Sequence, residues 1–210
     1  MNESGASGQV WLNIEDNQAA VTVNVNNVVP TEPHAQHIHI GGQGACPTPD
    51  ADKNGDGIIS VPEGKPSYGD VQVALTKDGD SAADSALAVD RMPTGGEGSY
   101  TYERTLDVSD QVVQDLANGK ASVVVHGIDP NGDGKYSGDA KSELDPELPL
   151  EATAPAACGE LVAAPQGGME TGEGGVADEA ASGALVAAGG VLAAAAAVGA
   201  FAIRRQRSNV

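Results

Sequence analysis

Residues 34–46 read His-Ala-Gln-His-Ile-His-Ile-Gly-Gly-Gln-Gly-Ala-Cys and hold three of the four histidines in the chain and one of its two cysteines. Side chains alternate between two faces along a β-strand, so His37 and His39 share one face and the isoleucines share the other. The isoleucine face can join a core, which leaves two imidazoles side by side, an arrangement that suits a transition metal. This stretch therefore predicts a strand that carries a candidate metal site.

Strand signals recur along most of the chain. The fourth histidine, His126, ends a valine-rich stretch, and the second cysteine, Cys158, begins another apolar stretch. Alternating or β-branched runs bounded by turn residues predict strands at 9–14, 20–26, 37–40, 70–75, 99–106, 121–126 and 158–162. Residues 110–118 have the apolar spacing of one short helix. We expect an all-β domain over 8–164, an antiparallel Greek-key sandwich or barrel, after a disordered segment at 1–7.

The composition narrows the function classes. Aromatic residues make up only 3% of the chain, so the core must be built from Val, Ile and Leu, which favours β-structure. A net charge of −19 makes nucleic acid a poor partner. The two cysteines lie too far apart for a zinc knuckle or a redox CxxC pair, and they suit one long-range disulfide in an oxidising compartment.

Residues 52–63, Asp-Lys-Asn-Gly-Asp-Gly-Ile-Ile-Ser-Val-Pro-Glu, match the twelve-residue EF-hand loop at each diagnostic position. An Asp/Asn/Gly-rich turn is the alternative, but it does not account for a glutamate at the twelfth position. We therefore predict calcium as a cofactor, with ligands from Asp52, Asn54, Asp56, Ile58 (through its carbonyl), Ser60 and Glu63.

The flanks of this first acidic loop (52–63) differ from those of a calcium sensor. Pro47 and Pro49 are expected to prevent a helix before the loop, and Gly64 and Pro66 to stop one after it. Ser60 and the glutamate three residues later can still form a one-turn capping box. Without a helix pair to open, calcium is expected to clip the loop rather than to switch it.

The second acidic loop (129–157) begins with the first half of the same pattern. Its candidate calcium ligands are Asp129, Asn131, Asp133 and Lys135, the last through its carbonyl. The twelfth position is Ala140, so the bidentate ligand is missing unless Asp139 or Glu143 substitutes. The alternative is a glycine-rich acidic turn without an ion.

The order His-x-His, Cys, Val-Val-His and Ala-Cys-Gly resembles the copper–zinc superoxide dismutase family and, more closely, the bacterial chordin-like (CHRD) domains. The resemblance covers about residues 9–163. It implies a dismutase-like fold, copper ligands at His37, His39 and His126, and a disulfide between Cys46 and Cys158. Gly69-Asp70 matches the family's Gly-Asp, whose aspartate ligates zinc.

The sequence departs from the dismutase pattern in ways that bear on activity. No histidine lies between His39 and His126, so the bridging ligand and the other zinc histidines are absent, and Pro155 replaces the arginine that attracts superoxide. The three histidines are either a copper site or a vestigial polar cluster. His34 is either a fourth ligand or, as we expect, an exposed loop residue. We assign no catalytic residue and expect a non-catalytic calcium-binding module; the alternatives are a copper-dependent dismutase and a copper-binding surface protein.

The C-terminal region predicts a membrane anchor. Residues 165–182 have the composition of a flexible linker, and 183–203 carry no charge over a length that spans a bilayer. The basic tail at 204–210 then lies in the cytoplasm and the domain outside the cell, as a single-pass protein. Residues 1–7 show no export signal, so we expect an upstream in-frame start that encodes one. Thr171-Gly172 before the apolar run also resembles a sortase signal without its Leu-Pro, which would attach the domain to a cell wall; the sequence names no protein or cell-wall partner.

Overall fold

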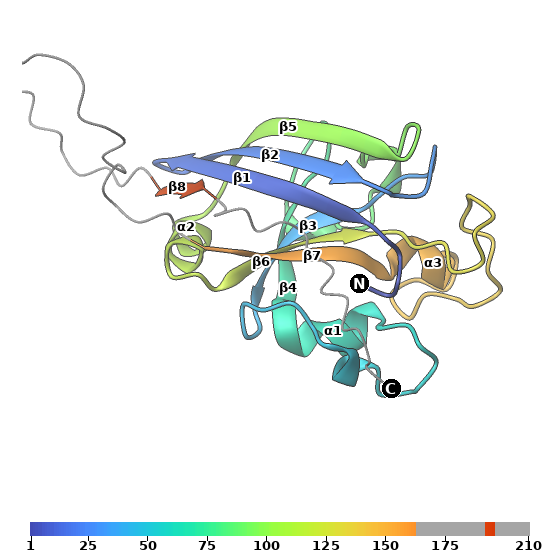
Figure 1. Ribbon diagram of the computed structural model, residues 1–210. Coiled ribbons are helices and arrows are strands. Elements are labelled where there is room, and N and C mark those ends of the chain that lie inside the picture. Colours follow the sequence, from blue (N-terminus) through green and yellow to red (C-terminus); the bar gives the residue numbers. More distant parts are fainter. Residues whose placement is uncertain (163–191, 196–210) are drawn as a thin grey trace, which may run out of the picture.

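The computed structural model describes residues 1–162 and 192–195, and these form two antiparallel four-stranded sheets (Figure 1). One sheet has the strand order β5–β2–β1–β8 and the other β4–β3–β6–β7. The expectation of an all-β antiparallel domain is confirmed. The strands are β1 (Ser7–Glu15), β2 (Gln18–Asn26), β3 (Gln36–Gly41), β4 (Gly69–Ala74), β5 (Ser99–Asp107), β6 (Ala121–His126), β7 (Pro155–Leu161) and β8 (Leu192–Ala195).

The core lies between the two sheets and follows from the alternation of apolar residues. β1 and β2 pair along their whole lengths from Glu15 opposite Gln18, and Asp16 takes the left-handed conformation that a two-residue hairpin requires. Their inward-facing Val, Leu and Ile side chains pack against the isoleucines of β3 and the valines of β6. Each such side chain contributes about 1.5–3 kcal/mol on burial.

β3 is buried on both faces, although its alternating sequence suggests one face in the core and one outside. Ile38 and Ile40 enter the core, while His37 and His39 face the other way and are only 3% and 1% exposed. On this outer side, the backbone carbonyl of Gly69, at the start of β4, reaches the His39 ring. The backbone carbonyl of Ala86, in the segment after β4, reaches the His37 ring. The imidazoles are therefore shielded from solvent.

Short helices connect the strands. The predicted helix at 110–118 is confirmed as α2 (Asp110–Ala117), capped by Ser109, whose hydroxyl accepts the Val112 N–H. Three single turns and one further short helix had no clear signal in the sequence: η1 (Pro49–Ala51), η2 (Ala83–Ser85), η3 (Val89–Arg91) and α3 (Leu150–Thr153).

The expectation that Gly64 and Pro66 stop a helix after the first acidic loop is wrong, because α1 (Val61–Tyr68) runs through both. The ring of Tyr68 folds back over Gly64, where a Cβ would lie 2.5 Å from it, and its hydroxyl donates to the Val61 carbonyl. The missing side chain at Gly64 thus admits a buried aromatic ring that holds the helix together despite the proline. The expected capping box is confirmed at Ser60, whose N–H donates to the Glu63 carboxylate.

The expectation of a disordered segment at 1–7 is also wrong. The Asn2 side-chain amide donates to the carbonyls of Ile59 and Pro155, and the Ser4 hydroxyl donates to that of Ala156. Because the outer edge of β7 offers free carbonyls, these polar side chains anchor the segment. β7 itself begins at Pro155, three residues before the expected start at Cys158.

Only part of the predicted C-terminal organisation falls on described residues. Leu192–Ala195, within the span predicted as a transmembrane helix, form β8 along the otherwise open edge of β1. No helix in the described ranges has both the length and the apolar character to cross a bilayer. The linker at 165–182, the rest of the span at 183–203, the tail at 204–210 and the sortase-like Thr171-Gly172 lie outside the described residues.

Candidate metal centre

The structure brings three of the predicted site residues together on the outer face of the second sheet. His37 and His39 project from β3, and His126 ends the neighbouring strand β6. Since Val124 pairs with His37, His126 follows two residues later on the same face. One ring nitrogen from each of these residues, the histidine triad, lies within 4.8 Å of the other two. The ring centroids are 5.1 to 6.0 Å apart.

Backbone carbonyls fix the tautomer of each imidazole in the histidine triad. The carbonyl oxygens of Ala86, Gly69 and Thr153 lie 2.9, 3.0 and 2.6 Å from one nitrogen of each ring. Since a carbonyl only accepts, that nitrogen must carry the proton and the other keeps its lone pair. The lone-pair nitrogens, His37 Nδ1, His39 Nε2 and His126 Nε2, have no hydrogen-bond partner within the described part of the chain.

Burial keeps the three rings neutral. Desolvation lowers the pKa of His126 to about 3 and that of His39 to about 4, and it holds the pKa of His37 well below the usual range. Hydrogen bonds to the carbonyls oppose this shift but do not overcome it. Three neutral lone pairs that converge in a buried place are the donor set that a transition-metal ion requires, so these residues fit a metal.

The carbonyls that orient the rings had no signal in the sequence, because any residue can supply one. Gly69, between α1 and β4, has φ +92° and no space for a Cβ, which would lie 2.2 Å from the Ile40 carbonyl oxygen. The Tyr68 ring packs edge-on against His39, with centroids 4.6 Å apart. Ser122, directly opposite His39 on β6, has a buried hydroxyl without a partner among the described residues. A serine inside a valine-rich strand was a visible signal that the sequence reasoning missed.

His34 lies outside the histidine triad, and the expectation that it is exposed is wrong. Its side chain is fully buried, with Nδ1 2.8 Å from the His126 carbonyl oxygen and Nε2 2.9 Å from that of Val29. A neutral imidazole has one N–H and donates to only one of these carbonyls, but each nitrogen lies against a backbone carbonyl and neither belongs to the cluster of the histidine triad. His34 instead holds the end of β6 against the segment that leads into β3.

Asp70, matched to a zinc ligand by the dismutase resemblance, is exposed and forms an ion pair with Lys65 at 2.6 Å. Pro155, at the position of the dismutase arginine, is buried at the start of β7. Neither residue contributes a ligand atom to the cluster around the histidine triad.

The first acidic loop is exposed and wound around its own side chains. Asp52 accepts the N–H groups of Gly55 and Gly57, and Glu63 accepts those of Lys53, Asn54 and Ser60. Asn54 and Asp56 each accept an N–H two residues further along. The N–H groups that Glu63 accepts, that of Ser60 most strongly and those of Lys53 and Asn54 less so, lower the pKa of Glu63. Among the described residues, only the histidine triad brings three ligand atoms of His, Cys, Asp or Glu within 4.8 Å of one another. The carboxylates of the first acidic loop therefore lie further apart than the ring nitrogens of the triad.

The second acidic loop shows the same local pattern over a shorter stretch. Asp129 accepts the N–H groups of Gly132 and Gly134, and Asp133 accepts that of Lys135. Glu143, a candidate substitute for the missing twelfth ligand, instead accepts a hydrogen bond from the Ser60 hydroxyl in the first acidic loop, at 3.0 Å. The two acidic loops are therefore joined at Ser60.

The predicted disulfide is confirmed. Cys46 and Cys158 are bonded, with Cα atoms 5.7 Å apart. The bond ties the segment after β3 to the middle of β7. In the chain-entropy description, closing a loop of this length stabilises the domain by at most about 5 kcal/mol.

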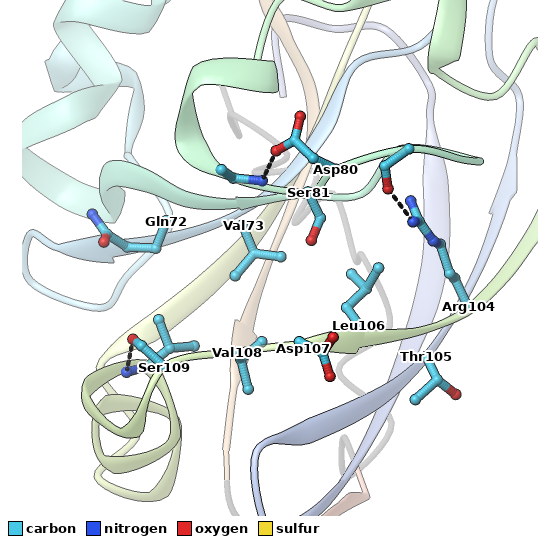
Figure 2. A pocket seen from close by; sticks show the side chains of 13 residues that line it. Gln72, Val73, Asp80, Ser81, Arg104, Thr105, Leu106, Asp107, Val108 and Ser109 are labelled. Atoms are coloured by element: carbon cyan, nitrogen blue, oxygen red, sulfur yellow. Dashed lines mark hydrogen bonds between the residues drawn. The ribbon is translucent and has the colours of Figure 1, made fainter.

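A pocket of about 440 Å³ lies apart from all of these residues, between β4, the 79–82 turn, β5 and the start of α2 (Figure 2). Arg104 reaches across one side of it, but its guanidinium donates to Thr76 and to the Gly79 carbonyl. None of the buried polar side-chain atoms without a partner in the described part of the chain lines this pocket, so it offers less for specific chemistry than the histidine triad does.

Comparison with known proteins places the domain. The CHRD domain family model matches residues 1–134, which include β1 to β6, the first acidic loop and the whole histidine triad. No curated protein and no solved structure matches the chain. Since the family model covers more than half of the sequence, the chain belongs to the CHRD domain family.

Proposed function

We propose that this CHRD domain is an extracellular, membrane-anchored β-sandwich module that holds copper in the histidine triad and calcium in its acidic loops, without enzymatic turnover. One observation carries the proposal: three buried imidazole lone pairs converge while each N–H is bonded to a backbone carbonyl.

A vestigial polar cluster is the competing interpretation, and energetics argue against it. A buried polar atom without a partner costs about 1–3 kcal/mol. Three such atoms side by side would be costly in a domain whose net stability is about 5–15 kcal/mol. A bound metal ion would satisfy all three at once, which gives the arrangement a reason to exist. Histidine and copper are also the pairing that the dismutase resemblance implies.

Turnover of superoxide is not part of the proposal, although the three histidines match a dismutase. Copper would supply one-electron chemistry, but the chain must attract the anion and bring protons to the site. Pro155 provides no cation, and the fourth histidine, His34, lies outside the triad with each ring nitrogen against a backbone carbonyl. The net charge of −19 repels an anionic substrate.

Calcium is proposed for the first acidic loop because its carboxylates recur at EF-hand spacing and end in Glu63, which is also the third residue of α1. Only the 3₁₀ turn η1 precedes the loop, so no helix pair is present for an ion to open. Asn2 bonds both the N–H and the carbonyl of Ile59, which pins the loop to the domain. These contacts support a structural clip. The second acidic loop is the weaker candidate, since Ala140 replaces the twelfth ligand.

The cellular placement follows from the disulfide and the C-terminal sequence. A long-range disulfide persists in oxidising compartments, which supports a location outside the cell. The uncharged span at 183–203 and the basic tail at 204–210 support a single-pass anchor with the domain outside. Such an anchor requires Leu192–Ala195 to leave the edge of β1, where they form β8, for the bilayer. Attachment to a cell wall through Thr171-Gly172 is the alternative.

Metal analysis of the full-length protein, purified without chelator, tests the proposal. We expect one copper ion per chain, which is lost in His126→Ala and kept in Asp56→Asn. We expect bound calcium to be lost in Asp56→Asn and kept in His126→Ala. Copper content that is equal in the wild type and in His126→Ala would contradict the triad site. Calcium alone would leave a calcium-clipped module without the copper centre.

A further inference from the structure

The donor set of the histidine triad is electrically neutral. Each ring has its N–H bonded to a carbonyl of Ala86, Gly69 or Thr153, so each offers a lone pair and no negative charge. Among residues 1–162 and 192–195, no Asp, Glu or Cys ligand atom joins the cluster. Nothing in the donor set therefore offsets the charge of a bound cation.

The histidine triad is also closed to water. Its three side chains are 1 to 3% exposed, and the pocket of Figure 2 is lined by other residues. An ion that enters must exchange its hydration shell for the three imidazoles. Because the energy of desolvating an ion rises with the square of its charge, a dication is penalised about four times as strongly as a monocation.

The number of donors points the same way. Zinc sites complete a tetrahedron with four ligands, and cupric copper prefers four or more in a tetragonal arrangement. The histidine triad offers three nitrogens. The only other buried side-chain atom without a partner among the described residues is Ser122 Oγ, a neutral hydroxyl across from His39. A three-coordinate, closed-shell ion matches three donors without a further ligand.

From the neutral donors, the burial and the number of ligands together, we infer that the histidine triad selects cuprous copper, Cu⁺, over Cu²⁺ and Zn²⁺. This inference rests on the proposed copper function and adds the oxidation state. The domain would then bind monovalent copper selectively, as a copper carrier or store needs to. A redox centre, by contrast, must hold both oxidation states equally well.

Competition titrations on the full-length protein test the selection. Cu⁺ is measured against a chromophoric cuprous chelator without oxygen, in ascorbate, which keeps copper reduced and leaves the disulfide intact. Cu²⁺ and Zn²⁺ are measured against chelators of their own. Exposed carboxylates can bind Cu²⁺ weakly, so a His37→Ala/His126→Ala double variant provides the background to subtract.

We expect one Cu⁺ per chain, bound at least about a hundredfold more tightly than Cu²⁺ or Zn²⁺, and lost in the double variant. Cu²⁺ bound as tightly as Cu⁺ and dependent on the same histidines would overturn the selection and leave the copper site standing. No histidine-dependent copper in either oxidation state would overturn the proposed function itself. A preference for Zn²⁺ over both would overturn the selection and the assignment of copper.

A substitution at Ser122 tests the charge argument directly. Ser122→Asp places a carboxylate beside His39, and we expect the preference for Cu⁺ over Cu²⁺ to fall at least tenfold, whereas Ser122→Ala leaves it unchanged. Circular dichroism of each variant checks that the sandwich is intact. An unchanged preference in a folded Ser122→Asp protein would contradict the inference, and the wild-type titrations decide the matter if that variant does not fold.

Discussion

The histidine triad and the first acidic loop are both candidate metal sites, but they are built in opposite ways. The triad joins two strands from distant parts of the chain and is buried, and its donor atoms have no partner among the residues that the structure describes. The loop is one continuous segment, is exposed, and uses its own N–H groups to satisfy the carboxylates of Asp52 and Glu63. An ion would complete the triad but would have to compete with hydrogen bonds in the loop. We therefore expect tight binding at the first and weak binding at the second.

Removing one donor from each site in turn should give the largest difference in copper affinity between two variants. His126→Ala leaves two imidazoles and a cavity, and we expect copper affinity to fall about a thousandfold or more, whereas Asp56→Asn leaves copper affinity unchanged. Chelator competition measures both. A copper affinity that falls equally in the two variants would mean that the sites are not separate.

Acid should act on the triad and spare the loop. The pKa values of all three rings of the histidine triad are lowered in the folded state from about 6.5, so the unfolded chain binds their protons first. The contribution of each neutral ring to the free energy of unfolding is therefore fully present above about pH 6.5. As the pH falls below this value, this contribution decreases by about 1.4 kcal/mol per pH unit for each ring. Between pH 7.5 and 5.5 we expect the metal-free protein to lose roughly 4 kcal/mol through the three rings of the histidine triad.

Urea unfolding at the two pH values, with chelator present, measures this loss. His39→Gln removes one of the three titrating rings of the triad, so its loss over the same interval should be about two-thirds as large. A wild-type protein that is equally stable at both pH values would show that the rings are not held neutral.

Calcium should produce a smaller effect than acid. Extracellular calcium sites have dissociation constants of about 0.1–1 mM. At ten times that concentration, one site adds about 1.4 kcal/mol to the free energy of unfolding. Thermal melting with calcium and with chelator should show this increase in the wild type and lose most of it in Glu63→Gln, with Asp133→Asn as the milder variant. Identical melting in both conditions would remove calcium from the account.

The smallest effect is expected at Ser60, where the two acidic loops meet. Ser60→Ala removes the hydrogen bond from this buried hydroxyl to the exposed Glu143 carboxylate, and we expect a loss of about 1 kcal/mol in the free energy of unfolding. The same loss in Glu143→Ala, which removes the acceptor, without further loss in the double variant, would show that the two residues act as a pair. Additive losses would mean that they stabilise the domain independently.

The sequence predicted what depends on spacing and missed what depends on distant contacts. Strand alternation sufficed to place His37 and His39 on one face and His126 at the end of another strand. The helix through Gly64 required knowing that the Tyr68 ring folds over it, and the burial of His34 required knowing that the Val29 and His126 carbonyls lie on its two sides. The carbonyls that set the tautomers carry no residue signature, so only the folded structure could reveal them.

The pairing of β3 with β6 sets the order in which the domain can acquire its ions. The histidine triad does not exist until β3 and β6 have come together from opposite halves of the domain. The first acidic loop lies within twelve consecutive residues and needs no such long-range contact to form. On the proposed function, a chain exported unfolded would therefore take up calcium early and copper only at the last stage of folding. Bound copper would then indicate that the domain has folded correctly, because a misfolded chain lacks the assembled histidine triad.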